Sequence, residues 1–290
     1  MAEAPKGKGT AVRILVIDDE AVIKEVLQIA FEEAGWQVMK ADTGEEAVRR
    51  LRDSEFDVLV VDKNLPGMSG VDFIREVRKH NRVIRVLMIT AYGSVESAVE
   101  TLNLGIDAYL EKPFPNVSDV VRAVKVAMAR FDARWFDSAP PEPAARPPPG
   151  LLGPRAAQGR SPGRDLTVVV GSPDDQLRSL IASHLDARDR IQLSASAQDV
   201  LACVSRDRPD LAVLDASFTT PDIIELIAAI KAATPHTTNV VVADSLPLTT
   251  IKRLIDLQVQ ALIDRSAESG KLRRRLADVL TQLRSTPAPR

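Results

Sequence analysis

The sequence is poor in the features that mark disulfide-rich, zinc-binding and membrane proteins. Its one cysteine, Cys203, excludes an intramolecular disulfide framework and a CxxC zinc site. Cys203 lies in the apolar stretch VLACV, where a structural core thiol is the expected role. No apolar run is long enough to span a bilayer, and the N-terminus MAEAPKGKGT is not followed by a signal-peptide core. These absences predict a cytoplasmic protein with no membrane contact.

An excess of charge of one sign is also lacking. Lysine and arginine total 38 and aspartate and glutamate total 40, for a formal net charge of −2. This balance gives no general attraction to nucleic acid or to an acidic membrane surface. DNA is therefore an unfavoured partner.

Proline-rich sequence interrupts the chain near its middle. A length of 290 residues suggests two domains, and the segment DSAPPEPAARPPPGLLGPRAAQGRSPGRD cannot bury enough apolar surface to fold by itself. We expect a spacer over 132–164 that joins domains at 11–131 and 165–285. Residues 1–10 are expected to be disordered, and 286–290 to form a tail.

Each half alternates short apolar strands with amphipathic helices. In the first half RILVI, WQVMKA, FDVLVV, RVLMI and AYL read as strands, and the intervening stretches have helical spacing. Nearly continuous apolar strands between helices indicate a parallel sheet covered on both faces. The predicted fold class is α/β, with two flavodoxin-like (βα)5 doubly wound domains joined by the proline-rich linker.

The second half repeats the first at an offset of 153 residues. This shift places Asp62 on Asp215 and the helix-capping Thr43 on Ser196. The strands also align at this offset without a gap, which favours an internal duplication.

Polar side chains follow the strands of the first half. Asp18 and Asp19 follow the first strand, Asp62 ends the third, Thr90 follows the fourth and Lys112 follows the fifth. Ligands of doubly wound sheets bind at the carboxyl ends of the strands, so these side chains should share one rim. Crowded carboxylates resist joint ionisation, and Mg²⁺ would relieve that conflict. Such a set suits phosphoryl transfer, with Asp62 as a nucleophile that forms an acyl phosphate.

The motifs VIDDE (16–20), VVDKNLPGMSG (60–70), ITAYGS (89–94) and YLEKPF (109–114) resemble the receiver domain of two-component response regulators. This resemblance covers about residues 11–131. It implies that Asp62 accepts phosphate from a histidine kinase. It implies Mg²⁺ bound directly by Asp19 and Asp62, with Asp18 acting mainly through water and Asn64 contributing its backbone carbonyl.

The same resemblance implies roles for three further positions. Lys112 would pair with the phosphoryl group and precede a cis peptide bond to Pro113. Thr90 would move toward that group, and Tyr109 would rotate inward behind it. Haloacid-dehalogenase-like phosphatases use similar residues, but they carry a second aspartate two positions after the nucleophile, and Asn64 stands there in this chain.

The second half keeps little of this set. At the 153-residue offset Asp18 and Asp19 fall on Gly171 and Ser172, and Thr90 falls on Ala243. Lys112 falls on Arg265, which we expect to fork onto Asp215 with two hydrogen bonds. Asp174 and Asp175 lie nearby and are interpreted as helix-capping residues. The second half is therefore predicted to be a degenerate receiver in which Asp215 and Arg265 are structural.

The sequence shows no separate DNA-binding or enzymatic output domain, so we expect signalling through phosphorylation-dependent protein contacts. The protein is not expected to be an enzyme beyond supporting its own phosphorylation and dephosphorylation. A downstream protein partner is implied, and the first domain could also form a homodimer. Two alternatives stay open: a DNA-binding regulator that uses the basic C-terminal helix with Lys271, Arg273, Arg274 and Arg275, and a phosphate sink in a phosphorelay.

Overall fold

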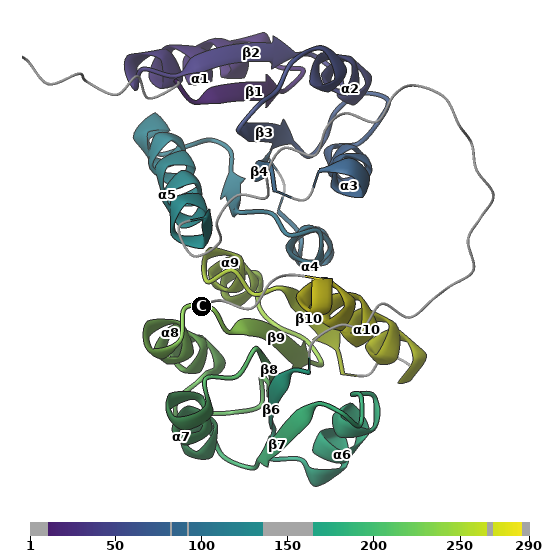
Figure 1. Ribbon diagram of the computed structural model, residues 1–290. Coiled ribbons are helices and arrows are strands. Elements are labelled where there is room, and N and C mark those ends of the chain that lie inside the picture. The colour runs from purple at the N-terminus through teal and green to yellow at the C-terminus, as the bar shows by residue number, and fades with distance from the viewer. Residues whose placement is uncertain (1–10, 82, 92, 136–164, 266–268, 286–290) are drawn as a thin grey trace, which may run out of the picture. The chain divides into compact units, whose positions relative to one another are not determined.

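The computed structural model describes residues 11–81, 83–91, 93–135, 165–265 and 269–285. Strands and helices alternate throughout these ranges, as the sequence predicts (Figure 1). The predicted disordered N-terminus, the tail and residues 136–164 of the predicted linker lie outside the described residues.

The first half contains five strands, each followed by a helix. The elements are β1 (Arg13–Ile17), α1 (Ala21–Glu33), β2 (Gln37–Ala41), α2 (Gly44–Asp53), β3 (Val58–Asp62), α3 (Gly70–His80), β4 (Arg85–Thr90), α4 (Val95–Asn103), β5 (Ala108–Glu111) and α5 (Val117–Trp135). The last helix thus ends four residues beyond the predicted end at Phe131. Its extra turn takes up the start of the segment predicted as linker.

The five strands form one parallel sheet in the order β2-β1-β3-β4-β5. Because β1 lies between β2 and β3, the chain changes its direction of winding at β1, and the carboxyl ends of β1 and β3 lie side by side there. Register pairs Ile17 with Val61 and Asp62 with Ile89. The residues that follow β1, β3 and β4 therefore meet at one rim.

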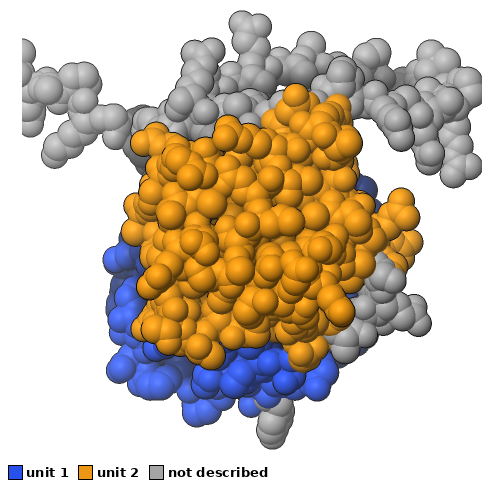
Figure 2. Space-filling view, turned by 90° about the horizontal axis from the view of Figure 1, so that it is seen from below, with its two compact units in different colours: residues 1–129, 245–262 blue, residues 130–244, 263–290 orange. Residues whose placement is uncertain are grey.

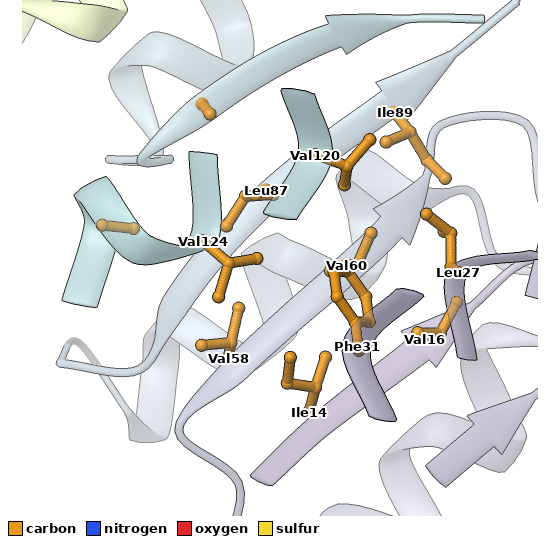
Figure 3. Packing of buried hydrophobic residues seen from close by; sticks show 12 residues of the cluster. Ile14, Val16, Leu27, Phe31, Val58, Val60, Leu87, Ile89, Val120 and Val124 are labelled. Carbon is orange, nitrogen blue, oxygen red and sulfur yellow. The ribbon is translucent and has the colours of Figure 1, made fainter. Parts of the chain in front are cut away.

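A cluster of apolar side chains holds one face of this sheet to α1 and α5 (Figure 3). Val16 and Val60 from the central strands contact Leu27 and Phe31 of α1, and Val120 and Val124 of α5 complete the cluster. All of these side chains are fully buried. On helix α1 the polar Lys24 lies on the buried face, whereas the apolar Val22 is 69% exposed.

The second half has the same architecture. Its elements are β6 (Thr167–Gly171), α6 (Asp175–Ser183), β7 (Arg190–Ser194), α7 (Ala197–Asp207), β8 (Leu211–Asp215), α8 (Ile223–Ala233), β9 (Thr238–Ala243), α9 (Leu248–Asp256), β10 (Ala261–Asp264) and α10 (Ser269–Ser285). The strand order β10-β9-β8-β6-β7, read from its other end, is that of the first sheet. The predicted duplication of the strand–helix pattern is therefore present in the fold.

Strand register corrects the predicted alignment of the two halves at one place. Ile17 pairs with Val61 in the first sheet, and Gly171 pairs with Leu214 in the second. The offset is thus 153 residues at the third strand but 154 at the first. Asp18 corresponds to Ser172 rather than to Gly171. The sequence could not show this shift because the valines, leucines and isoleucines of these strands fit either register.

Helix caps follow the sequence closely. Thr43 accepts a hydrogen bond from the N–H of Glu46, as Ser196 does from Asp199. The sequence TGEE (43–46) also predicts that Glu46 bonds back to the N–H of Thr43, but its carboxylate accepts from the N–H of Asp42 instead. Each cap satisfies a donor at a helix start and so fixes where the loop above the sheet ends.

Grouping residues by proximity divides the chain into two compact units (Figure 2). One unit holds residues 1–129 and 245–262, and the other holds 130–244 and 263–290. The domain boundaries predicted from the sequence follow chain order and place 245–262, which carries α9, in the second domain. No helix of the described residues combines the length and apolar character needed to cross a membrane.

Candidate functional site

Asp62 is the last residue of β3 and is 3% exposed. The strand places its carboxylate at the rim, and the backbone N–H of Asn64 donates to Oδ2 at 2.8 Å. Helix α3 begins close to this turn, since a Cβ on Gly70 would lie 2.0 Å from the carbonyl oxygen of Asp62. Gly70 is therefore needed for the chain to leave the rim in this direction.

Lys112 supplies the positive charge at the centre of the rim. Its backbone N–H donates to the carbonyl of Thr90 at 2.8 Å, which continues the β4–β5 ladder by one residue. Its Nζ lies 2.7 Å from Oδ2 of Asp18, 3.0 Å from Oδ1 of Asp62 and 2.9 Å from Oε1 of Glu20. The Lys112 side chain is 7% exposed, so its pairs with Asp18 and Asp62 are shielded from water, whereas the side chain of Glu20 is 58% exposed. The peptide bond to Pro113 is cis, as predicted.

The ionisation of this cluster is coupled. Burial raises the pKa of Asp18, and the charge of Asp62 adds to that rise, whereas Lys112 and the N–H of Glu20 oppose it. Burial acts to lower the pKa of Lys112, but the bonds to Asp18, Glu20 and Asp62 outweigh it and raise that pKa. The carboxylates thus need a neighbouring cation in order to be charged together.

The donor set fits a hard divalent cation. Oδ2 of Asp18 and Oδ1 of Asp62 are buried and have no partner of hydrogen-bond geometry, although both form ion pairs with Lys112. Asp19 and Asn64, the other predicted ligands, lie exposed at the same rim. Within the described residues no three acidic, histidine or cysteine side chains already surround a common point. A cation site here would need Asp19 to turn toward Asp62.

The two predicted switch residues lie beside this cluster. Thr90 ends β4 and is fully buried. Tyr109 on β5 is 6% exposed, and its hydroxyl lies 3.1 Å from Oγ of Ser97 in the first turn of α4. Burial raises the pKa of Tyr109. The ring already points inward, which is the end point of the predicted rotation, and the rotation itself stays a prediction.

The rim of the second sheet holds the equivalent aspartate in a different setting. Asp215 is 1% exposed, and the N–H of Ser217 donates to its Oδ1 at 2.9 Å, as Asn64 does to Asp62. Ser172, in the position of Asp18, donates its hydroxyl to Oδ2 of Asp215 at 2.5 Å. Both carboxylate oxygens of Asp215 therefore have hydrogen-bond donors from their own domain.

Arg265 takes the place of Lys112, as predicted, but does not fork onto Asp215. Its N–H donates to the carbonyl of Ala243, and its Nη2 bonds Oδ2 of Asp174 at 2.8 Å. The distance from Nη2 to Oδ2 of Asp215 is 3.4 Å, an ion pair without a hydrogen bond. The expected two-bond fork is wrong because Ser172 already bonds that oxygen. Asp174 caps α6, as predicted, and the N–H of Leu177 lowers the pKa of Asp174, with help from Arg265.

Two residues at the first rim, Glu20 and Lys24, were not predicted from the sequence. Glu20 is the third acid of VIDDE, and its ion pair with Lys112 was not anticipated. Lys24 interrupts the apolar face of α1, about one turn before Leu27 and two turns before Phe31. A lysine at a core position was the available signal, since burying an ammonium is costly unless it is paired.

Comparison with known proteins agrees with the motifs. Residues 14–125 match the family model described as response regulator receiver domain. The chain is 35% identical over 133 residues to the probable transcriptional regulatory protein TcrX of Mycobacterium tuberculosis, covering 46% of this chain and 56% of that protein. It is 38% identical over 121 residues to the phosphate regulon transcriptional regulatory protein PhoB of Escherichia coli, covering 41% and 52%.

A solved receiver domain protein from Methanospirillum hungatei matches 43% of this chain and all of its own length, with 28% identity and a TM-score of 0.42. The chain spans about half the length of the curated relatives it matches. Residues 14–125 of this chain are a response regulator receiver domain, the module that the four motifs indicate.

Proposed function

We propose that this chain is a phosphorylation-responsive signalling protein in which Asp62 accepts a phosphoryl group from a histidine kinase. The observation that carries the proposal is the setting of Asp62. Its buried Oδ1 lies 3.0 Å from Lys112 Nζ, beside Asp18, and among the described residues it has this ion pair but no partner of hydrogen-bond geometry. An aspartate oxygen held in this way is available as a nucleophile.

Different residues of the rim would have different roles in phosphoryl transfer. Oδ1 of Asp62 attacks phosphorus, the bond from phosphorus to the donor's nitrogen breaks, and an acyl phosphate forms. Lys112, whose Nζ already contacts this oxygen, neutralises charge on the incoming phosphoryl group. Asp18, Asp19, Asp62 and the carbonyl of Asn64 would hold Mg²⁺, which when bound supplies further positive charge to the phosphoryl oxygens.

Signalling would follow from a change at Thr90 and Tyr109. Thr90 ends the strand beside Asp62, so its hydroxyl can bond a phosphoryl oxygen only after phosphorylation. Tyr109 joins β5 to α4 through Ser97, so a shift of Thr90 has a direct route to the surface formed by α4 and β5. This differential contact is what a two-state switch requires.

The second half acts in this proposal as a degenerate receiver. Asp215 has its hydrogen bonds satisfied by Ser172 and Ser217, and Arg265 balances its charge. Among the described residues of this rim, each oxygen of Asp215 already has a donor, so none needs a metal ion. The second half would then contribute protein contacts, and the chain would perform no chemistry beyond its own phosphorylation and dephosphorylation.

The proposal is tested by labelling the full chain with a small acyl-phosphate donor and Mg²⁺. Wild type and Asp215→Ala should take one label on Asp62, whereas Asp62→Ala and wild type in EDTA should take none. Asp215→Ala is the matched control because it removes the equivalent aspartate of the other sheet. Label that persists in Asp62→Ala would show that another residue is the acceptor.

A DNA-binding role is the second candidate. Arg273, Arg274 and Arg275 are exposed on α10, and the matched relatives are named as transcriptional regulators. Affinity for duplex DNA that falls steeply with salt, and that is lost when these three arginines become glutamine, would favour this role. Transfer of label from Asp62 to a second carrier protein would instead favour a phosphate sink.

A further inference from the structure

We infer that Lys24 is a positioning residue for the cation site: it holds the main chain of Asp18 so that the Asp18 carboxylate lies beside Asp62. The inference rests on the proposed Mg²⁺-dependent function of that rim. Three observations support the inference: the amine of Lys24 is buried, it has two bonding partners, and an equivalent residue stands in the second half.

Lys24 is almost completely buried, with 8% of its side chain exposed. Its Nζ donates to the carbonyl oxygen of Asp18 at 2.7 Å and also to the carboxylate of Asp42. Asp18 is held from its other side as well, since its N–H donates to the carbonyl of Ala41 at 3.1 Å. The main chain of Asp18 is thus bonded at both polar atoms, and its carboxylate accepts from the N–H of Glu20 at 2.9 Å and lies against Lys112 in the rim.

Asp42 connects this lysine to the other side of the site. It immediately precedes Thr43, the N-cap of α2, so Lys24 ties the acidic turn to the start of that helix. In the first turn of α2, Glu45 accepts from the N–H of Met68 at 3.1 Å. Met68 lies in the loop that follows Asp62 and Asn64. Helix α2 therefore braces both loops that would supply ligands.

The second half contains a residue equivalent to Lys24. Comparing the two distinguishes positioning of a cation ligand from a general structural role. Arg178 occupies the position of Lys24 and donates to the carbonyl of Ser172, the residue in the place of Asp18. Its remaining partner is Asp175 in its own helix, at 2.9 Å. In each half, a basic side chain of the first helix, α1 or α6, thus bonds the carbonyl of the residue that follows the first strand. Of these two side chains, Lys24 also bonds Asp42, which precedes the next helix, α2.

If Lys24 acted on Mg²⁺ only through its charge, its removal would change the Mg²⁺ affinity in the opposite direction. Removing a positive charge near the rim would strengthen Mg²⁺ binding by simple Coulomb attraction. Asp42 already pairs with this ammonium, which leaves geometry as the main effect of Lys24. A side chain that orients a ligand from behind typically contributes about 10–100-fold to metal affinity.

The test is calorimetric titration of the full chain with Mg²⁺, together with thermal unfolding in its absence. Lys24→Met should bind Mg²⁺ about tenfold more weakly than wild type. Lys24→Arg, which restores the donor that the second half uses naturally, should recover most of the affinity. Arg178→Met is the matched control: it should lower the melting temperature and leave Mg²⁺ affinity unchanged.

Unchanged or tighter binding by Lys24→Met, or a folded Lys24→Arg that fails to recover, would overturn the inference. If Lys24→Met does not fold, Lys24→Gln, which is shorter and uncharged, is titrated in its place with the same expected loss. A wild-type protein that binds no Mg²⁺ would overturn the proposed function as well. Normal wild-type binding that the lysine variants leave intact would overturn the inference alone.

Discussion

The two sheets of this chain carry rims built on the same frame but with different electrostatics. Asp62 and Asp215 end equivalent strands, and each accepts from the N–H two residues later. Lys112 and Arg265 follow the fifth strand of each sheet, and each donates its N–H to the end of the fourth. In the first rim three carboxylates surround one ammonium.

In the second rim a hydroxyl replaces one of the carboxylates. Ser172 donates to Asp215, whereas Asp18, in the same position, can only repel Asp62. One change from acid to hydroxyl turns a repulsion into a hydrogen bond and removes the need for an added cation. The comparison teaches that the nucleophilic aspartate by itself does not make a site, because its reactivity depends on what its neighbours leave unsatisfied.

The largest expected effect comes from removing the central cation of each rim. Lys112→Ala should slow labelling of Asp62 by about 100-fold, because it deletes a charge that contacts the attacking oxygen. Arg265→Ala should leave labelling at the wild-type rate. Initial rates with a small acyl-phosphate donor measure both. An equal loss in the two variants would mean that the rims are functionally coupled and that the comparison fails.

Removing the second aspartate should affect stability and not chemistry. Asp215→Ala leaves Ser172 and Arg265 without a buried partner, and should lower the free energy of unfolding by about 1–3 kcal/mol. Chemical denaturation measures the loss, and added Mg²⁺ should not change it. Asp215→Asn, which keeps an acceptor for Ser172, is the control and should lose less. A label on Asp215 in the wild-type protein would contradict its structural role.

Thr90 tests whether the first rim communicates with its surface. Thr90→Ala should be labelled on Asp62 as wild type is, but phosphorylation should no longer change hydrogen exchange in α4 and β5. The reason is that the hydroxyl is the group that would distinguish the phosphorylated state. Ser97→Ala, which removes the bond to the Tyr109 hydroxyl, should weaken the same response without affecting label. A full response in Thr90→Ala would exclude this route.

The smallest effect is the pH dependence of the Lys24–Asp42 pair, which the second half lacks. The bond from Lys24 lowers the pKa of Asp42 from its ordinary value of 3.8. A lowered folded-state pKa stabilises the fold above the unfolded value and loses that contribution as pH falls through the folded value. The coupling energy in a Lys24→Met, Asp42→Asn double-mutant cycle should be below about 1 kcal/mol.

This coupling energy should be nearly the same at about pH 7 and about pH 5 and should decrease mainly as pH falls toward and below about 3.8, where the unfolded-state carboxylate is half protonated. Urea unfolding at each pH provides the four free energies. A coupling energy that already disappears between pH 7 and pH 5 would show that the pKa of Asp42 is not lowered by its partner.

Local sequence was sufficient to predict the fold and most of the first rim. Apolar runs such as VLVV, and helical spacing between them, gave the alternation of strands and helices because burial on both faces imposes that pattern. Side chains at strand ends, such as Asp62 and Lys112, were predictable as neighbours because parallel strands bring their carboxyl ends to one edge. The family match over 14–125 confirms the receiver domain.

Some contacts could be identified only from the tertiary structure. These are the contacts that depend on strand register and on which acceptors a long side chain lies near. Apolar strand positions fit an offset of 153 or 154 equally well, so only strand pairing showed that Ser172 stands opposite Asp215. The contacts of Lys24 were not predicted, and Arg265 bonds Asp174 instead of forming the predicted two-bond fork with Asp215. A long polar side chain chooses among acceptors brought together from distant segments, and their distances exist only once the chain has folded.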